Sequence, residues 1–211
     1  MEICEELISY NLAVHKLDLQ LEAQAFDTDY LVLDQLGGVH QSLADILISM
    51  TTANKKDYEN MISRLNKYPV LVGQNQILLK EGLRWKVTAV KMFLQKVPAQ
   101  FEQLLTEKVE ESPFYKPFLE MNSSLSEVDK KEIQGQAREA LANKVYPALK
   151  KFKEFVVQDY IPNAREGISQ IDLPKGKAWY HFLVKMHTTT NKTAEELHQN
   201  YEQAIETSPN G

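Results

Sequence analysis

The stretch Ser126–Val156, "SEVDKKEIQGQAREALANKVYPALKKFKEFV", carries the longest helical pattern of the chain. Two acidic residues follow Ser126 in the first turn, where they suit the positive end of a helix dipole. The apolar residues recur mostly at steps of four, which places them on one helical face. They are Val128, Ile133, Ala137, Leu141, Val145, Leu149, Phe152 and Val156. Pro147 lies inside this run and removes a backbone donor, so we expect a kinked helix.

Helical patterns continue on both sides of this stretch. Only 8 glycines and 8 prolines occur in the 211 residues, and 43% of the residues are hydrophobic. Residues 2–26 contain neither breaker, and their apolar positions alternate steps of four and three. These positions are Ile3, Leu7, Tyr10, Val14, Leu17 and Leu21. We find no convincing alternating strand, so the sequence predicts an all-α protein, an irregular multi-helix array with long kinked helices.

We expect a single helical segment over residues 1–211, because no internal repeat divides it. Its parts are a first long helix (1–26), short helices and connectors (27–121), a long helix kinked at Pro147 (122–170) and a helix–corner–helix unit (171–207). Within the second part, Thr52 or Asn54 is expected to cap one helix. Pro69 suits the first turn of another helix.

The charge balance argues against a nucleic-acid partner. The formal net charge is −5 and the pI is near 5.6, whereas nucleic-acid binders usually carry a basic excess. Four lysines lie between Lys144 and Lys153, but acidic residues follow at once, and we interpret the run as a solvated helix face. No signal-peptide pattern and no apolar window long enough for a membrane span occur. The default prediction is a cytoplasmic protein without a membrane partner.

The usual catalytic patterns are missing. A helix-borne zinc site needs two histidines at i and i+4 with a glutamate after the first, and this chain has no His-Glu pair. His181 and His187 are six residues apart, on different sides of a helix. Glu195–His198 is one Glu-x-x-His motif, whereas a di-iron bundle needs two. The lone Cys4 lies on an apolar stripe and is interpreted as an inert thiol. We therefore predict no metal or cofactor in this chain.

The stretch Leu173–His198, "LPKGKAWYHFLVKMHTTTNKTAEELH", combines three histidines with three consecutive threonines. Threonine hydroxyls can satisfy the backbone groups left open at helix ends. Thr193 followed three residues later by Glu196 is a capping box, which predicts a last helix over 194–206. At the least, this stretch is a helix, a threonine corner and a second helix.

Five segments in series resemble one family. They are "DQLGGVHQSLADIL" (34–47), "KKDYENMISRLNKYP" (55–69), "SPFYKPF" (112–118), "VYPALKKFKEFVVQDYIPNARE" (145–166) and the threonine-corner stretch. Their order and spacing are similar to the mainly bacterial family called Domain of Unknown Function 885. The resemblance implies a mostly helical zinc metallopeptidase, carboxypeptidase-like, with helices around a deep substrate cleft.

The same resemblance implies that this chain is incomplete as an enzyme. The family's zinc motif, of the His-Glu-x-x-x-Gly-His-His type, is expected C-terminal to the threonine corner, beyond Gly211. The chain is therefore expected to be an internal segment of a larger metallopeptidase-like fold. Zinc and a peptide substrate are expected only in the intact protein, and the resemblance supplies no catalytic or metal-binding residue here.

Some positions do match family elements. Those carried over are Gly37, Gly38 and His40, then Tyr180, His187, Thr188 and Thr189, and finally Thr193, Glu196 and His198. In a complete member these side chains can line the substrate cleft. They make equal sense as structural devices, namely a turn, a corner and a cap, and the sequence leaves both interpretations open.

Three hypotheses about function follow. In the first, the chain is a helical cleft-wall segment that is catalytically incomplete by itself. In the second, it is a non-catalytic helical interaction module. In the third, it is a helical bundle whose likeness to the family is misleading. The sequence predicts neither a substrate nor an oligomeric state.

Overall fold

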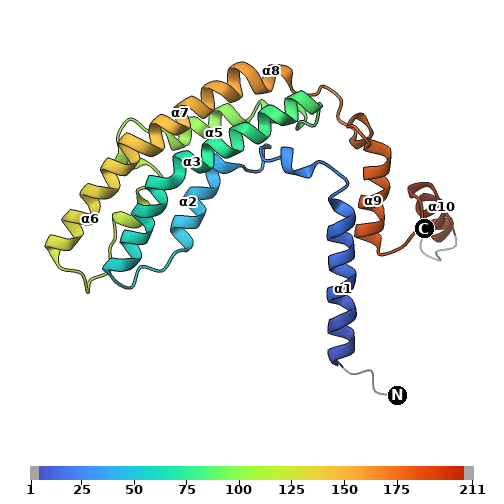
Figure 1. Ribbon diagram of the computed structural model, residues 1–211, viewed down its shortest axis with the longest axis horizontal. Coiled ribbons are helices and arrows are strands. Elements are labelled where there is room, and N and C mark those ends of the chain that lie inside the picture. The colour runs from blue at the N-terminus through green and yellow to red at the C-terminus, as the bar shows by residue number, and fades with distance from the viewer. Residues whose placement is uncertain (1–4, 207–211) are drawn as a thin grey trace. The chain divides into compact units, whose positions relative to one another are not determined.

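The computed structural model describes residues 5–206. Over this range the chain forms helices joined by turns, and β structure is limited to two isolated bridges, Leu33 with Gly38 and Val90 with Arg165 (Figure 1). The predicted all-α, multi-helix array is therefore confirmed.

The chain divides into two compact units, where the sequence predicted a single segment. Among the described residues, unit 1 consists of 5–28 and 168–206, and unit 2 consists of 29–167. The physical reason is that each unit buries its own apolar side chains. The two ends of the chain share one aromatic cluster, in which Phe26 contacts both Trp179 and Phe182.

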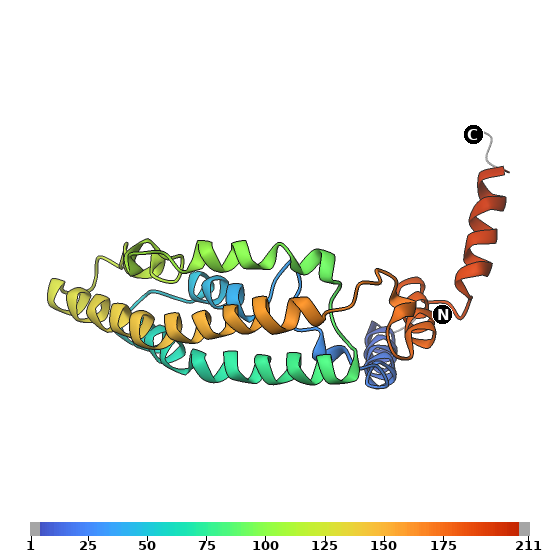
Figure 2. The same cartoon turned by 90° about the horizontal axis from the view of Figure 1, so that it is seen from above.

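Unit 2 is a layered helical array. Figure 2 shows α7 running between α3 and α5, and α2 contacts both α3 and α5. Its α-helices are α2 (Val39–Ser49), α3 (Lys55–Trp85), α4 (Lys91–Leu94), α5 (Val97–Leu104), α6 (Glu127–Ala140), α7 (Tyr146–Phe155) and α8 (Ile161–Asn163). Short 3-10 turns are η1 (Thr28–Tyr30), η2 (Val109–Glu111) and η3 (Lys116–Phe118).

Helix α3 is one uninterrupted helix of 31 residues, although short helices were expected in this region. Its cap is Asn54, whose side chain accepts hydrogen bonds from two backbone N–H groups of the first turn. Pro69 lies inside the helix rather than at the start of a new one. A proline in a helix interior costs about 3 kcal/mol. Eight buried residues along α3 offset this cost, since burying one large apolar side chain contributes about 1.5–3 kcal/mol.

Two π-turns interrupt the long helical rod that runs from α6 to α8. They are η4 (Leu141–Val145) and η5 (Val156–Tyr160), and each ends just before a proline, Pro147 or Pro162. Proline lacks an N–H and its ring clashes with the carbonyl four residues earlier. The wider turn removes that clash, so α6, α7 and α8 follow one another end to end as a curved rod (Figure 1). The predicted kink at Pro147 corresponds to the position of η4.

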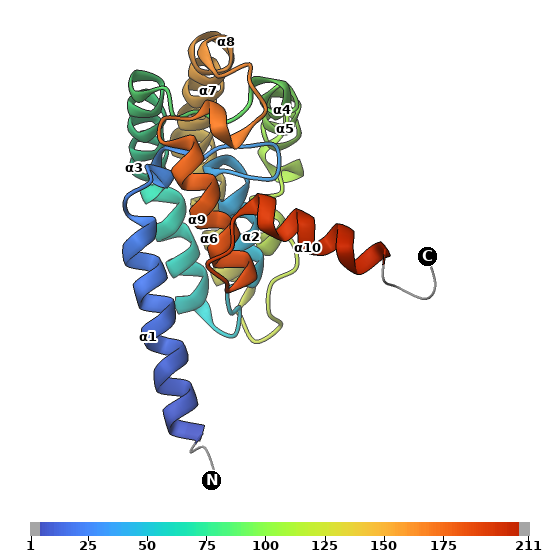
Figure 3. The ribbon, with the colours of Figure 1, turned by 90° about the vertical axis from the view of Figure 1, so that its right-hand side faces the viewer.

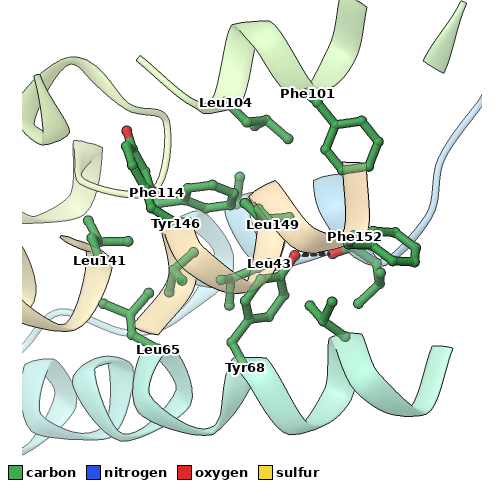
Figure 4. Close-up of a cluster of buried hydrophobic side chains, with 14 of the residues drawn as sticks. Leu43, Leu65, Tyr68, Phe101, Leu104, Phe114, Leu141, Tyr146, Leu149 and Phe152 are labelled. Carbon is green, nitrogen blue, oxygen red and sulfur yellow. Dashed lines mark hydrogen bonds between the residues drawn. The ribbon is translucent and has the colours of Figure 1, made fainter. Parts of the chain in front are cut away.

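The core of unit 2 is aromatic and aliphatic. Figure 4 shows side chains from α2, α3, α5 and α7 meeting in one cluster, including Leu43, Leu65, Phe101 and Phe152. Phe101 meets Phe152 edge-on, with ring centroids 5.8 Å apart. These contacts fix the spacing between α5 and α7.

Unit 1 contains α1 (Glu5–Ala23), the 3-10 turn η6 (Gln170–Asp172), α9 (Gly176–Thr188) and α10 (Ala194–Glu206). Phe26 stacks on Trp179 with ring centroids 5.6 Å apart, and Lys185 pairs with Glu22 at 2.7 Å. These contacts join the end of α1 to α9, whereas α10 buries no residue and projects away from α9 (Figure 3).

Candidate functional site

The glycine pair at 37–38 forms a turn in unit 2. The Asp34 carboxylate accepts hydrogen bonds from the N–H groups of Leu36 and Gly37, at 2.7 and 3.0 Å. Neither glycine adopts a left-handed φ. Gly38 is required by close approach instead. A Cβ there would lie 2.7 Å from Leu33 Cδ1 and 3.0 Å from His40 Nδ1.

His40 is fully buried beneath this turn. Its Nε2 lies 2.8 Å from Gln100 Oε1, and Gln100 Nε2 donates to the Gln35 carbonyl oxygen at 2.9 Å. The second bond orients the amide, so its oxygen accepts and His40 carries its proton on Nε2. The ring stacks on Phe101, with centroids 4.7 Å apart. Through these two hydrogen bonds, Gln100 on α5 holds α2 and the glycine turn against α5.

The electrostatics keep this imidazole neutral. Burial lowers the pKa of His40 below its usual 6.5, and the hydrogen bond to Gln100 only partly opposes that shift. Nδ1 is buried without a hydrogen-bond partner, so a proton placed there would have no acceptor. Nearby, burial also raises the pKa of Tyr68, whose hydroxyl donates to the Val39 carbonyl at 2.7 Å. Gly38 and His40 therefore have a structural role, because they allow α2 to be held against α5. We call the hydrogen-bonded pair His40 and Gln100 the histidine clasp.

The threonine corner lies in unit 1, at the end of α9. Thr188 Oγ1 donates to the Val184 carbonyl at 2.7 Å and lies 3.1 Å from Thr190 Oγ1. Thr189 adopts a left-handed φ of 55° and its N–H donates to the Lys185 carbonyl at 2.9 Å. A β-branched residue rarely takes this conformation. The corner therefore closes the helix at a cost in backbone strain.

The remaining matched positions lie in unit 1, on α9, on α10 or, for Thr193, at the residue before α10. Tyr180 is 44% exposed and His187 is also exposed. The predicted capping box is confirmed, because Thr193 N–H donates to the Glu196 carboxylate at 2.7 Å and Glu196 N–H donates to Thr193 Oγ1 at 3.1 Å. His198 pairs with Glu202 at 3.1 Å, one turn further along α10.

The matched positions thus fall into two groups. Gly37, Gly38 and His40 belong to unit 2, whereas those from Tyr180 to His198 belong to unit 1. Between residues 5 and 206, no group of three or more His, Cys, Asp or Glu side chains could hold a metal ion. Cys4 lies outside the described residues.

Sequence reasoning missed a groove in unit 2, between α3 and the α6–α7 rod. We call it the α3–α7 seam. It consists of two adjoining hollows of about 370 and 250 Å³, which share Asn143 and Lys144. From α3 it is lined by Ile62, Asn66, Pro69, Val72, Gly73 and Gln76. From the rod, the lining includes Glu139, Asn143, Lys144, Pro147, Ala148 and Lys151.

The signal that could have located the seam is the placement of small and proline residues. Pro69 and Gly73 follow each other by one helical turn on α3, and Pro147 and Ala148 face them from α7. None of these four has a long side chain to fill the space. Recognising the groove required knowing that α3 and α7 are neighbours, which periodicity does not reveal.

A second groove, of about 590 Å³, lies between α5 and the α7–η5 stretch. Its lysines include Lys153, whose ammonium pairs with Glu102 at 3.1 Å across the groove. Lys144, Lys150 and Lys151 of the lysine run are exposed, in agreement with a solvated helix face, and Lys151 lines both this groove and the seam.

These features define an all-helical protein with open grooves and a buried histidine clasp. Residues 2–207 match the family described as "Bacterial protein of unknown function (DUF885)". The chain belongs to this family, and the hypothesis of a misleading likeness is set aside.

The fold is also similar to a solved structure, that of a candidate lipoprotein from Colwellia psychrerythraea. The TM-score is 0.73 at 19% sequence identity, over 80% of this chain. The match spans only 29% of the length of that protein's chain. No curated protein matches this sequence. Within the described residues, no helix combines the length and apolarity that a membrane crossing requires.

Proposed function

We propose that this chain forms one helical wall of the substrate cleft of a zinc metallopeptidase-like, carboxypeptidase-like protein, and is catalytically incomplete by itself. Two observations together carry the proposal. The family's pattern runs through residues 2–207, yet the sequence contains no His-Glu pair. The similar solved chain, of which this match spans 29%, supports a setting within a larger protein.

In such a protein, zinc would activate water or polarise the peptide carbonyl, and the ligands and general base would come from the part that carries the family's zinc motif. The residues of this chain would bind and orient the peptide. Open grooves between rigid helices suit that role, because positioning depends on surfaces that do not yield when the ligand binds.

The first test uses the purified full chain. We expect no stoichiometric zinc by mass spectrometry and no chelator-sensitive hydrolysis of N-blocked dipeptides. A family member that carries the His-Glu motif serves as the positive control. Stoichiometric zinc together with hydrolysis that a chelator abolishes would overturn the claim of catalytic incompleteness.

A second test addresses the cleft-wall role directly. Residues 29–167 are grafted into a family member that carries the His-Glu motif, in place of its matching segment. We expect the chimera to bind zinc and keep peptidase activity. A folded, zinc-loaded chimera without activity would contradict the cleft-wall role, while leaving the first test unaffected.

The alternative, a non-catalytic interaction module, is favoured by one observation. Unit 2 closes a core of its own, in which Leu47, Leu65 and Phe101 are fully buried. A module of this kind predicts a stable monomer or dimer with a cooperative thermal transition. A molten, aggregating chain in light scattering would argue against it.

A cytoplasmic location and the absence of a nucleic-acid or membrane partner are parts of the same proposal. A single cysteine, which allows no internal disulfide, suits a reducing compartment, and the net charge of −5 disfavours nucleic acid. Fractionation of cells that express the chain tests the location. Recovery of the chain in the envelope fraction would contradict a cytoplasmic location. The envelope fraction is the relevant comparison because the similar solved structure is that of a candidate lipoprotein.

A further inference from the structure

We propose that the α3–α7 seam is a docking groove for an extended acidic peptide segment. The proposal concerns binding alone and does not depend on zinc chemistry or on the cleft-wall role. It rests on the space, the charges and the free amides of the seam.

The space lies beside Gly73. A Cβ built on this glycine would meet no atom within 4 Å beyond its chain neighbours and the backbone of its own helix, and the buried apolar residue Val72 lies next to it. Pro69 and Pro147 close the sides without long side chains. The hollow here measures about 370 Å³, within the range of roughly 300–1,000 Å³ that is usual for ligand sites. It can accept one apolar side chain of a bound peptide.

The charges favour an acidic ligand at this end. Lys144 and Lys151 line the hollow beside Gly73, and no carboxylate lines it. Neither ammonium forms an ion pair with any of the residues that the structure describes. Lys153, two residues beyond Lys151, is already paired with Glu102. Glu139 lies in the other hollow of the seam, so acidic residues of the peptide belong at the Lys144–Lys151 end.

Amide side chains along the seam are suited to a peptide backbone. The side chains of Asn66, Gln76 and Asn143 make no hydrogen bond within residues 5–206, and each offers both donors and an acceptor. From Ile62 to Gln76 the seam follows α3 for about 21 Å, at 1.5 Å per residue. An extended chain spans about 3.3 Å per residue, so roughly six peptide residues fit.

The π-turn η4 shapes the rod side of the seam. Asn143 and Lys144 both belong to this turn, and both line the two hollows. Its wider spiral differs from the regular α-helical register, and single π-turns inside α-helices occur frequently at functional sites. Here the turn adds an amide and a cation to the same groove.

The test is fluorescence anisotropy of the full chain with labelled hexapeptides. The acidic probe has one leucine followed by two glutamates, and the basic probe has two lysines in place of the glutamates. We expect saturable binding of the acidic probe, at least about tenfold tighter than that of the basic probe. Raising the salt concentration should weaken it, since exposed charges are screened.

Two glycine variants provide a matched comparison. Gly73→Leu fills the hollow, whereas Gly135→Leu adds the same side chain on α6, where a Cβ also meets nothing within 4 Å. Both changes replace a helical glycine and favour the helix, so circular dichroism should show both variants folded. We expect Gly73→Leu to lose about tenfold or more in affinity and Gly135→Leu to bind as the parent chain does.

Charge reversal gives a second comparison. The double variant Lys144→Glu with Lys151→Glu should lose the acidic probe and gain the basic one, whereas Lys131→Glu, on an exposed position of α6, should change neither. The proposal is overturned by equal binding of the two probes, by no saturable binding, or by equal effects of the two leucine variants. It is also overturned if a single-stranded oligonucleotide displaces the acidic probe more effectively than unlabelled peptide does.

Discussion

Helices α1 and α3 show opposite relations between pattern and burial. Helix α1 has the more regular apolar spacing, yet none of its 19 residues is buried, and Leu17 and Leu21 are 58% and 64% exposed. Helix α3 contains a proline and two glycines, yet eight of its residues are buried and Leu65 has no exposed surface.

The difference shows that an apolar stripe specifies which face can be buried, whereas neighbouring helices determine whether it is. Helix α3 contacts α2, α6 and α7, so apolar side chains meet it along most of its length. In unit 1, Glu22 and Phe26 contact α9 and Ala25 contacts Lys175 just before it, and all three lie at or just beyond the end of α1. The two units should therefore respond differently to matched substitutions.

The largest contrast is expected between the two tryptophans, one in each unit. Trp179 is 4% exposed and stacks on Phe26, whereas Trp85 is 54% exposed at the end of α3. Trp179→Ala should cost about 3–5 kcal/mol and remove most of the small aromatic core of unit 1. Hydrogen exchange should then accelerate in α9 but not in α3 or α7. Trp85→Ala should change hydrogen exchange in neither unit. If Trp179→Ala accelerated exchange in both units, the expected difference between the two units would be contradicted.

The next contrast compares the same substitution in α3 and α1. Leu65→Ala removes a fully buried side chain and should lower the free energy of unfolding of unit 2 by about 2–5 kcal/mol. Leu17→Ala should change stability by no more than about 0.5 kcal/mol, because that side chain is already in solvent. Urea unfolding followed by circular dichroism measures both. Equal costs would mean that the α1 stripe is packed in solution.

A smaller effect is expected from pH, and it concerns His40 of unit 2. Because burial lowers the pKa of His40, the folded chain binds fewer protons than the unfolded chain below about pH 6.5. Stability should therefore fall from pH 7 to 5, by at most about 1.4 kcal/mol per pH unit, until the folded pKa is reached. His40→Gln can keep a donor for Gln100 and does not titrate. In this variant, the stability of α2 and α5, measured by hydrogen exchange, should lose most of its dependence on pH. An unchanged pH dependence of stability would mean that a group other than His40 causes it.

The smallest effect concerns two left-handed residues at helix ends. Thr189 ends α9 in unit 1 with φ 55°, and Lys86 ends α3 in unit 2 with φ 59°. Glycine accepts this conformation without strain, so each substitution to glycine should stabilise its unit, by about 0.5–1 kcal/mol at Thr189. The gain should be larger at Thr189, because its side chain is β-branched. Thermal unfolding monitored by Trp179 fluorescence tests Thr189→Gly, and a loss of stability would show that the corner is not strained.

The sequence was informative about local structure. The capping box at Thr193 and Glu196, the helix start near Ser126 and the helical stripe of Ile133, Ala137 and Leu141 all follow from side-chain chemistry within a few residues. The continuity of α3 could not be predicted from the sequence, because the tertiary contacts of its buried residues outweigh the local effect of Pro69. The reason for Gly38 was also missed, because the close approach of His40 and Leu33 is a contact in three dimensions.

By itself, the sequence determined the helical class, the apolar faces, several caps and the family, because these depend on neighbouring residues and on ordered motifs. Only the tertiary structure decided that α3 is buried while α1 is not, that His40 is a neutral clasp, and that two prolines and a glycine border one groove. Those outcomes depend on which helices pack together, and that pairing joins residues far apart in the chain.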